Sequence, residues 1–179
     1  MTIIPGTNIL GNPVRALAAV CLVAVTILCG CGENKFEQEV GKEKLAVNLA
    51  RETDDGDYSL ITTAELKKLL DDGEAIVLVD AMPADSYAKE HIPGAKRFTF
   101  TKEKMAVWDD ASADGKSQSD YEKVLGDKGG RVIVYCGFVE CLRSHNAARF
   151  ARELGYTKVE RYAGGIYAWK GAGHKTESE

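Results

Sequence analysis

One stretch constrains the fold of this chain more than any other. Residues 131–155 place a short apolar run, a cysteine-containing loop and an alanine-rich segment one after another. Val132–Tyr135 is β-branched and aromatic, which predicts a buried parallel strand. Segment 144–154 has alanine and leucine at helical spacing, with Ser144 as the predicted N-cap and Gly155 at the position where glycine often ends a helix.

The loop of this strand–loop–helix unit begins with Cys136. It lies at the carboxyl end of a strand and the amino end of a helix, where open α/β sheets bind ligands and where free N–H groups stabilise anions. We expect the helix terminus and Arg143 to lower the pKa of the Cys136 thiol and to make it reactive. The alternative is an inert, buried cysteine that packs as a small hydrophobic residue.

The first 30 residues have the features of an export signal. They carry one basic residue, Arg15, and no acid, and residues 16–28 are uncharged and mostly apolar. This run is shorter than the roughly 20 residues that span a bilayer, which favours a signal-peptide core over a membrane helix. The following Leu28-Cys29-Gly30-Cys31 resembles a bacterial lipobox, with Cys31 as the lipidated residue. An uncleaved anchor is the alternative.

Cleavage before Cys31 leaves two thiols, Cys136 and Cys141, because two of the five cysteines depart with the signal and one is lipidated. We expect an exported chain, tethered to a membrane by that lipid and facing the periplasm or the cell exterior, where disulfides can form. The whole chain has a net charge of −4, and loss of Arg15 takes it to −5. An acidic chain without a basic patch disfavours nucleic acid as a partner.

The mature chain divides by composition. Residues 31–57 are predicted to be the lipidated cysteine and a polar spacer with one weak helix around residues 40–50. A solvated face of the domain is the alternative for this segment. A single domain is predicted over residues 58–173, and residues 174–179 form a polar tail.

Strands and helices are predicted to alternate along the domain. Strands are expected at 58–61, 75–79, 96–100, 131–135 and 159–162, and helices after Thr62, at 85–90, 119–125, 144–154 and 166–170. Thr62 to Glu65 matches a capping box. This order predicts an α/β fold, a mostly parallel five-stranded sheet with helices on both faces.

Several motifs in this order resemble the rhodanese domain family. They are Val77-Leu-Val-Asp80 followed by His91-Ile-Pro-Gly-Ala95, then Val134-Tyr135-Cys136, then Gly164-Gly165-Ile-Tyr-Ala-Trp169. The chain departs from the family pattern at two places. Met82 stands where Arg is usual, and six residues, Cys141 among them, separate Cys136 from Arg143 where four are common. The loop is similar to the longer two-cysteine loop of some bacterial rhodanese-like proteins, and its width puts thiosulfate as a substrate in question.

The resemblance implies sulfur transfer. Cys136 is the implied catalytic nucleophile, which takes a sulfane sulfur from thiosulfate, a polysulfide or a persulfide and passes it to a thiol or other nucleophilic acceptor. The implied anion-binding residues are Gly137, Phe138, Val139, Glu140, Leu142, Arg143 and Ser144. No metal or other cofactor is implied. Cys141 is either a resolving thiol that forms a disulfide with Cys136 or a spectator.

Other residues near the motifs have a structural expectation. His91 is predicted to order the turn before Pro93, and Trp169 to lie in the core. His145 is expected to be a surface residue of the first helical turn rather than a modulator of charge. Asp80 is expected either to hold loop amides or to face the pocket.

Two further hypotheses remain open beside the sulfurtransferase. A thiol–disulfide redox protein would use the Cys136–Cys141 pair, and a rhodanese-like binding or sensing module would need no turnover.

Overall fold

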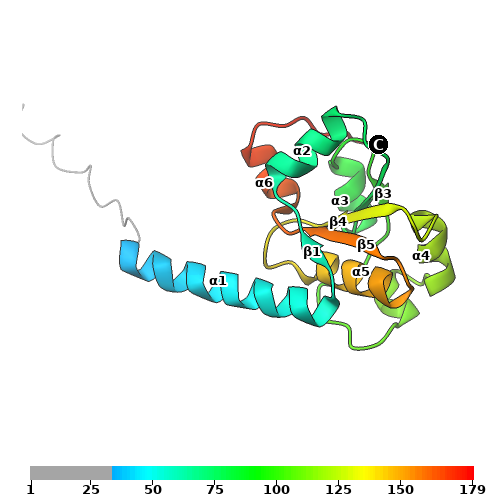
Figure 1. The fold of residues 1–179 in the computed structure, drawn as a ribbon, viewed down its shortest axis with the longest axis horizontal. Coiled ribbons are helices and arrows are strands. Elements are labelled where there is room, and N and C mark those ends of the chain that lie inside the picture. Colours follow the sequence, from blue (N-terminus) through cyan, green and yellow to red (C-terminus); the bar gives the residue numbers. More distant parts are fainter. Residues whose placement is uncertain (1–33) are drawn as a thin grey trace, which may run out of the picture. The chain divides into compact units, whose positions relative to one another are not determined.

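The computed structural model describes residues 34–179, so the predicted signal peptide and Cys31 lie outside the described residues. Within them the helices are α1 (Lys35–Gly56), α2 (Thr63–Asp71), α3 (Ala84–Lys89), α4 (Gln118–Leu125), α5 (Leu142–Glu153) and α6 (Gly165–Gly171), with a 3-10 turn η1 (Asp110–Ala113) (Figure 1). The strands are β1 (Ser59–Leu60), β2 (Ile76–Asp80), β3 (Lys96–Arg97), β4 (Arg131–Tyr135) and β5 (Lys158–Tyr162). None of these helices is long and apolar enough to cross a membrane.

The five strands form one sheet in the order β1-β5-β4-β2-β3, and every neighbouring pair is parallel. The predicted fold class is therefore confirmed. Strand β4 is central, with Val134 opposite Val79 on one side and Arg161 on the other. The chain order reverses between β2 and β4, and the carboxyl ends of these two strands form the crevice where such sheets bind ligands.

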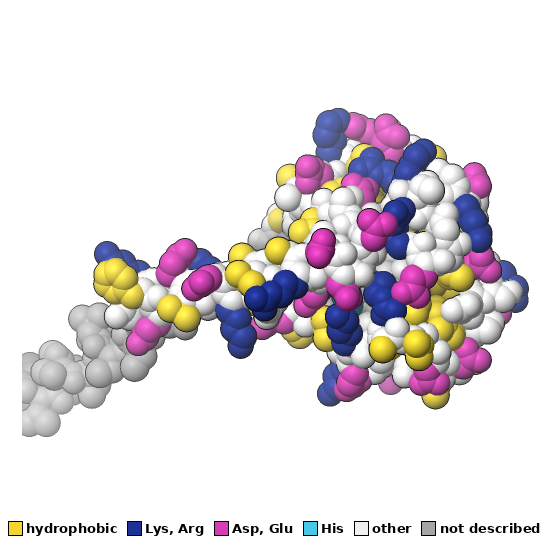
Figure 2. Space-filling model, turned by 60° about the horizontal axis from the view of Figure 1, so that its bottom comes forward, with side chains coloured by type: hydrophobic (Ala, Val, Ile, Leu, Met, Phe, Trp, Pro, Cys, Tyr) yellow, Lys and Arg dark blue, Asp and Glu magenta, His cyan; other side chains and the backbone are white. Residues whose placement is uncertain are grey.

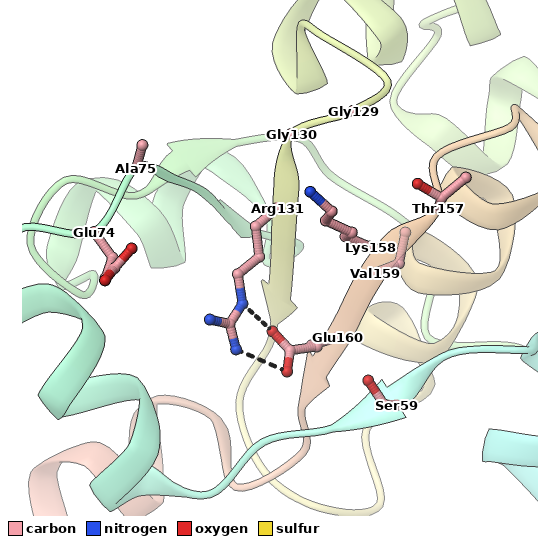
Figure 3. A pocket seen from close by; sticks show the side chains of 10 residues that line it. All are labelled: Ser59, Glu74, Ala75, Gly129, Gly130, Arg131, Thr157, Lys158, Val159 and Glu160. Carbon is pink, nitrogen blue, oxygen red and sulfur yellow. Dashed lines mark hydrogen bonds and ion pairs between the residues drawn. The ribbon is translucent and has the colours of Figure 1, made fainter.

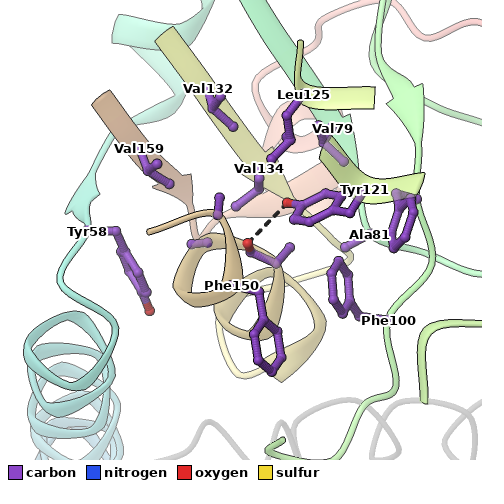
Figure 4. Close-up of a cluster of buried hydrophobic side chains, with 14 of the residues drawn as sticks. Tyr58, Val79, Ala81, Phe100, Tyr121, Leu125, Val132, Val134, Phe150 and Val159 are labelled. Carbon is purple, nitrogen blue, oxygen red and sulfur yellow. Dashed lines mark hydrogen bonds between the residues drawn. The ribbon is translucent and has the colours of Figure 1, made fainter. Parts of the chain in front are cut away.

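Side chains alternate between the two faces of β4, and each face carries its own core. Val132 and Val134 pack with residues of α4 and α5, as Figure 4 shows for Tyr121 and Phe150. Ile133 and Tyr135 belong to the opposite core, with residues of α2, α3 and α6. Both faces are thus covered by helices, which explains the uninterrupted apolar run of this strand.

The predicted helix signals are partly confirmed. The Thr62–Glu65 capping box is present, with the Glu65 carboxylate 2.8 Å from the Thr62 amide. Gly155 has a φ of +92° after the end of α5, as expected for a glycine C′. The prediction of Ser144 as N-cap is wrong. Helix α5 begins two residues earlier, Cys141 is its N-cap, and Ser144 is buried within its first turn.

Segment 35–56, predicted to be a spacer with a weak helix at residues 40–50, is one continuous helix, α1. Most of its side chains are exposed, but Leu45, Leu49 and Glu52 are half-buried. Its carboxyl-terminal part is attached to the domain by ion pairs of Glu52 with Arg161 and of Asp55 with Lys104. Polar composition indicated solvation correctly but did not reveal these contacts.

The predicted tail also contacts the domain. Glu177 forms an antiparallel bridge with His91, and both backbone hydrogen bonds measure 2.9 Å. His91 is buried, its ring stacks on Tyr87, and its Nδ1 lies 2.9 Å from the Tyr87 carbonyl oxygen. Trp169 is buried, as predicted.

The surface carries both signs of charge. Figure 2 shows Lys and Arg side chains interspersed with Asp and Glu over one face of the molecule. Pairs such as Lys123–Asp120 and Lys170–Glu90 account for part of this pattern. Exposed pairs of this kind contribute little to stability, about 0–1 kcal/mol each.

Candidate active site

The two thiols lie in one short loop between β4 and α5. Cys136 follows the last residue of β4 and is fully buried, whereas Cys141 at the start of α5 is 8% exposed. Both are free thiols. The Cys136 sulfur lies 3.2 Å from the Cys141 carbonyl oxygen and 3.1 Å from the Ser144 hydroxyl oxygen. The structure thus brings Cys136, Cys141 and Ser144 together at the carboxyl edge of the sheet.

The first turn of α6 holds the start of the loop. The amide of Ile166 donates to the Cys136 carbonyl and that of Tyr167 to the Gly137 carbonyl, both at 3.0 Å. Gly165 permits this approach, because a Cβ there would lie 2.3 Å from the Cys136 carbonyl oxygen, and its φ of +59° is one that glycine adopts readily. Gly165 is therefore a contact surface for the cysteine loop.

The outer part of the loop presents free backbone N–H groups. In the described part of the chain, the amides of Phe138, Val139 and Glu140 donate no hydrogen bond to another protein group. The Cys141 amide closes the turn by donating to the Phe138 carbonyl at 3.0 Å. A turn with several unpaired N–H groups is a concavity suited to an anion.

Two exposed aromatic rings stand beside this turn. Phe138 and Tyr167 have ring centroids 5.6 Å apart, and both side chains are largely exposed. Gly137 is buried, Glu140 is exposed, and Val139 and Leu142 are half-buried. The loop therefore combines an apolar rim with a polar backbone.

Arg143 does not face the loop as an unengaged cation. Its guanidinium donates to the carbonyl of Phe100, and the side chain is half-buried. Its backbone amide, together with that of Gly137, instead stabilises the Cys141 sulfur. The predicted anion-binding function of this residue stays a prediction.

The electrostatics of the two thiols differ from the expectation. Burial raises the pKa of Cys136 well above its usual value. The hydrogen bond from the Cys136 thiol, aided by the amides of Arg143 and Gly137, lowers the pKa of Cys141 to about 6. The prediction of a low pKa for Cys136 is thus wrong for this state. Cys136 is buried beneath the loop, and Cys141 occupies the helix terminus that stabilises a thiolate.

Sequence reasoning missed a buried cation beside this site. Arg161 on β5 is fully buried, and its Nε donates to the Ser144 hydroxyl oxygen at 2.9 Å. Its Nη2 donates to the carbonyls of Val139 at 3.0 Å and Cys141 at 3.1 Å. Val159 and Arg161 lie on the same, core-facing side of β5. A charged residue at a core-facing position was the signal that the sequence offered.

His145 is buried, so the prediction of a surface residue is wrong. The Tyr58 hydroxyl lies 2.9 Å from its Nδ1, and Asp55 Oδ2 lies 3.4 Å from its Nε2. Burial, and then the positive charge of Arg161, lower the pKa of His145 to about 4. The imidazole is therefore neutral near pH 7.

Asp80 ends β2 beside the loop. It is buried, and its Oδ1 accepts from the Met82 amide at 2.8 Å. Burial raises the pKa of this carboxyl. The Met82 thioether lies 3.8 Å from the place where a Cβ on Gly137 would be, so an apolar side chain adjoins the cysteine loop where the family pattern has Arg.

One cavity lies away from the cysteine loop. It has a volume of about 590 Å³ and contains the ion pair of Arg131 with Glu160 at the amino-terminal edge of β4 and β5 (Figure 3). Ligands of open α/β sheets bind at the opposite, carboxyl edge. Among residues 34–179, no group of three or more His, Cys, Asp or Glu side chains could hold a metal ion.

Solved structures with the same fold include several from bacteria. A protein of Bacillus halodurans is 22% identical with a TM-score of 0.55, covering 79% of this chain and 85% of that one. A thiosulfate sulfurtransferase of Pseudomonas aeruginosa is 22% identical with a TM-score of 0.55, covering 70% of this chain and 21% of that one. A protein of Anabaena is 25% identical with a TM-score of 0.52, covering 66% of this chain and 91% of that one.

Sequence comparison gives the family. A curated relative, an HTH-type transcriptional regulator of Mycobacterium tuberculosis, is 31% identical over 113 residues, which are 63% of this chain and 42% of the regulator. The chain thus matches less than half the length of that relative. The model of the rhodanese-like domain matches residues 62–172, from the capping box of α2 to the end of α6. This chain therefore belongs to the rhodanese-like domain family.

Proposed function

We propose that this chain is a sulfurtransferase in which Cys136 carries the transferred sulfur as a persulfide. The observation that carries the proposal is the placement of two free thiols at the carboxyl end of β4 in a rhodanese-like domain. The unpaired N–H groups of Phe138, Val139 and Glu140 support it, because a persulfide anion needs such donors. A thiosulfate sulfurtransferase among the solved structures of this fold supports the same reaction class.

Exposure to solvent turns the buried cysteine into a nucleophile. Displacement of the loop removes the burial that raises the pKa of Cys136, so its proton passes to solvent. The Cys136 thiolate then attacks the outer sulfur of the donor. A sulfur–sulfur bond forms at Cys136, the donor's sulfur–sulfur bond breaks, and its leaving group departs with the electron pair. A thiolate acceptor then attacks the outer sulfur of the persulfide, becomes a persulfide itself and restores Cys136 as a thiolate.

Access requires movement, because Cys136 is fully buried. The loop of residues 137–140 covers it and is the part that must be displaced before a donor arrives. Helix α6 holds the loop at the Cys136 and Gly137 carbonyls, and Arg161 holds it at the Val139 and Cys141 carbonyls. Displacement of the turn therefore breaks some of these hydrogen bonds.

The residues around the cysteine loop favour a polysulfide or a persulfide as the sulfur donor over thiosulfate. Thiosulfate is a dianion whose sulfonate end calls for fixed cations. Met82 is apolar, and the Arg143 guanidinium is engaged by the Phe100 carbonyl. The exposed rings of Phe138 and Tyr167 suit a donor with an organic or polysulfur chain.

We further propose that the reaction takes place in the cell envelope, with the chain held by lipid on Cys31. The lipobox resemblance and the apolar run before it support this location. Both sulfur donor and thiol acceptor would then be molecules of the periplasm or the cell exterior.

A second function, thiol–disulfide exchange, has one specific observation in its favour. Cys141 has a pKa lowered to about 6 and lies in the same short loop as Cys136, so it is equipped to attack an oxidised or persulfidated Cys136. This reading predicts a reversible disulfide and no transfer of sulfur to an acceptor.

Thiocyanate formation separates the two functions. The full-length chain in mild detergent is reduced and mixed with cyanide and either a polysulfide or thiosulfate. The sulfurtransferase predicts thiocyanate with multiple turnovers, a higher kcat/KM with the polysulfide, and loss in Cys136→Ser. Ala111→Ser, an exposed change far from the loop in sequence, is the control. Equal background rates in wild type and Cys136→Ser would reject the proposal.

A further inference from the structure

Arg161 is a fully buried arginine whose N–H groups all donate hydrogen bonds. A guanidinium has five N–H groups, and five hydrogen bonds leave Arg161. Their acceptors are Ser144, Glu52, Tyr58, Val139 and Cys141. Burying a charge is costly unless it is paired and fully hydrogen-bonded, so a site this complete implies a use.

Three of these bonds go to the segment that holds the two thiols. The carbonyls of Val139 and Cys141 are fixed by Nη2, which sets the path of the loop. The Ser144 hydroxyl accepts from Nε at 2.9 Å. Its own proton is thereby left for other acceptors, and two lie in reach: the Cys141 carbonyl at 3.4 Å and the Cys136 sulfur at 3.1 Å.

The Ser144 hydroxyl can therefore follow the state of Cys136. When Cys136 is a thiol, its S–H donates to the Ser144 oxygen, the Cys141 carbonyl or the Cys141 sulfur, and the hydroxyl proton points to that carbonyl. When Cys136 is a thiolate or a persulfide, the hydroxyl turns and donates to sulfur. Arg161 makes this possible by occupying a lone pair of the hydroxyl oxygen and fixing its place.

The counter-charge of Arg161 comes from outside the region that defines the family. Glu52 on α1 pairs with Nη1, and α1 ends before residue 62, where the family match begins. A cavity of about 210 Å³ lies between α1 and the loop, lined by Leu45, Asn48, Leu49 and Glu52 of the helix and by Val139, Glu140 and Leu142. Residues 45–52 of α1 thus border the cysteine loop.

Three further titratable groups face this network. Tyr58, which follows α1, accepts from Arg161 Nη1 at 3.1 Å and contacts His145 Nδ1. Asp55 lies beside His145 Nε2. His145 is neutral near pH 7 and adds no positive charge to the network. Glu52 is the carboxylate that pairs directly with the buried guanidinium.

We propose that the Glu52–Arg161 ion pair is a positioning device for the sulfur chemistry, which couples helix α1 to the Ser144 hydroxyl and to the cysteine loop and so sets the reactivity of Cys136. The inference rests on the proposed sulfurtransferase function and assigns α1 to the active site. Arg161 and Glu52 are positioning residues, because they act through Ser144 and the loop rather than on the donor.

The chain offers a matched control for this ion pair. Arg131 and Glu160 form a second ion pair across β4 and β5, at the opposite edge of the same sheet. The exposed fractions of the two carboxylates are nearly equal, 19% for Glu52 and 18% for Glu160. Replacing either glutamate by Gln removes the negatively charged partner of one arginine. Only Glu52 is connected, through its arginine, to the cysteine loop.

The test compares Glu52→Gln, Arg161→Lys and Glu160→Gln with wild type in the full-length chain. One readout is the rate of sulfur loading from a polysulfide, and the other is the rate of Cys136 alkylation by iodoacetamide across pH, followed by peptide mass spectrometry. We expect Glu52→Gln and Arg161→Lys to slow loading about tenfold or more, as small misplacements at reacting groups do, and to shift the pH midpoint of Cys136 alkylation away from that of wild type. Glu160→Gln should match wild type in both readouts.

The same experiment separates the inference from the function on which it rests. If wild type loads no sulfur, the proposed function fails, and alkylation alone then decides whether the ion pair positions Cys136. If wild type loads sulfur and Glu52→Gln loads and alkylates like Glu160→Gln, the inference is overturned. Thermal unfolding of each variant identifies any that fails to fold, and the half-buried Glu52 remains decisive if Arg161→Lys does not fold.

Discussion

The Nε of Arg161 lies 2.9 Å from the Ser144 hydroxyl oxygen, and the same oxygen lies 3.1 Å from the Cys136 sulfur. A buried cation and a buried thiol thus share one hydroxyl group. The pKa of Cys136 is raised by burial, and the hydrogen bond from Ser144 opposes that increase.

Removing the shared hydroxyl is expected to destabilise the fold. Ser144→Ala leaves the Arg161 Nε–H without an acceptor in a buried place, which costs about 1–3 kcal/mol. Urea denaturation measures the loss. The control is Ser119→Ala on the exposed side of α4, expected to change the free energy of unfolding by about 0.5 kcal/mol or less. Equal stabilities of the two variants would contradict the network.

The two thiols should react at different pH values. Cys141, with its pKa lowered to about 6, should be alkylated by iodoacetamide increasingly as pH rises through about 6, while buried Cys136 should stay slow until a higher pH. Peptide mass spectrometry after short pulses assigns each cysteine. In denaturant both should titrate near their ordinary value of about 8.5. Faster alkylation of Cys136 than of Cys141 in the folded chain is the opposing result.

Acidification should destabilise the chain through His145. Its pKa is lowered from 6.5 to about 4 in the folded state, so between these values the unfolded chain binds a proton that the folded chain does not. The free energy of unfolding therefore falls as pH decreases from about 6.5 to about 4. His145→Phe should flatten this part of the curve, measured by urea denaturation at several pH values. A curve of unchanged slope in the variant would assign the acid sensitivity to other groups.

The contact of α6 with the loop should tolerate no side chain at Gly165. Gly165→Ala places a Cβ 2.3 Å from the Cys136 carbonyl oxygen at a positive φ, and we expect a loss of about 1–3 kcal/mol together with slower sulfur loading. Gly171→Ala in the same helix has open space around its Cβ and should be neutral or stabilising by up to about 1 kcal/mol. Thermal unfolding measures both, and a neutral Gly165→Ala is incompatible with the described contact.

Local patterns in the sequence predicted the sheet and the position of the loop. The apolar run before Cys136 indicated a strand covered on both faces, and the two cores confirm it. The capping box at Thr62 and the glycine at 155 also behave as predicted, because each depends on residues that are close in sequence. Fold class therefore followed from periodicity and from the resemblance together.

The buried polar network could not be predicted in the same way. Arg161, Glu52 and Ser144 come from β5, α1 and α5, and their association depends on tertiary packing rather than on spacing. Polar composition made α1 look solvated, and a serine just before an alanine-rich run looked like a cap. The start of α5 at Leu142 moved Ser144 inward, where its hydroxyl serves Arg161 and Cys136 instead of the helix end.

The most direct test of the central claim is the intact mass of the full-length chain after reduction and exposure to a polysulfide. Wild type and Cys141→Ser are predicted to gain one sulfur atom that cyanide removes, and Cys136→Ser is predicted to gain none. The contradicting result is a wild-type chain that gains no sulfur but loses two hydrogens, with the loss abolished by either cysteine substitution, because that outcome describes a disulfide rather than a persulfide.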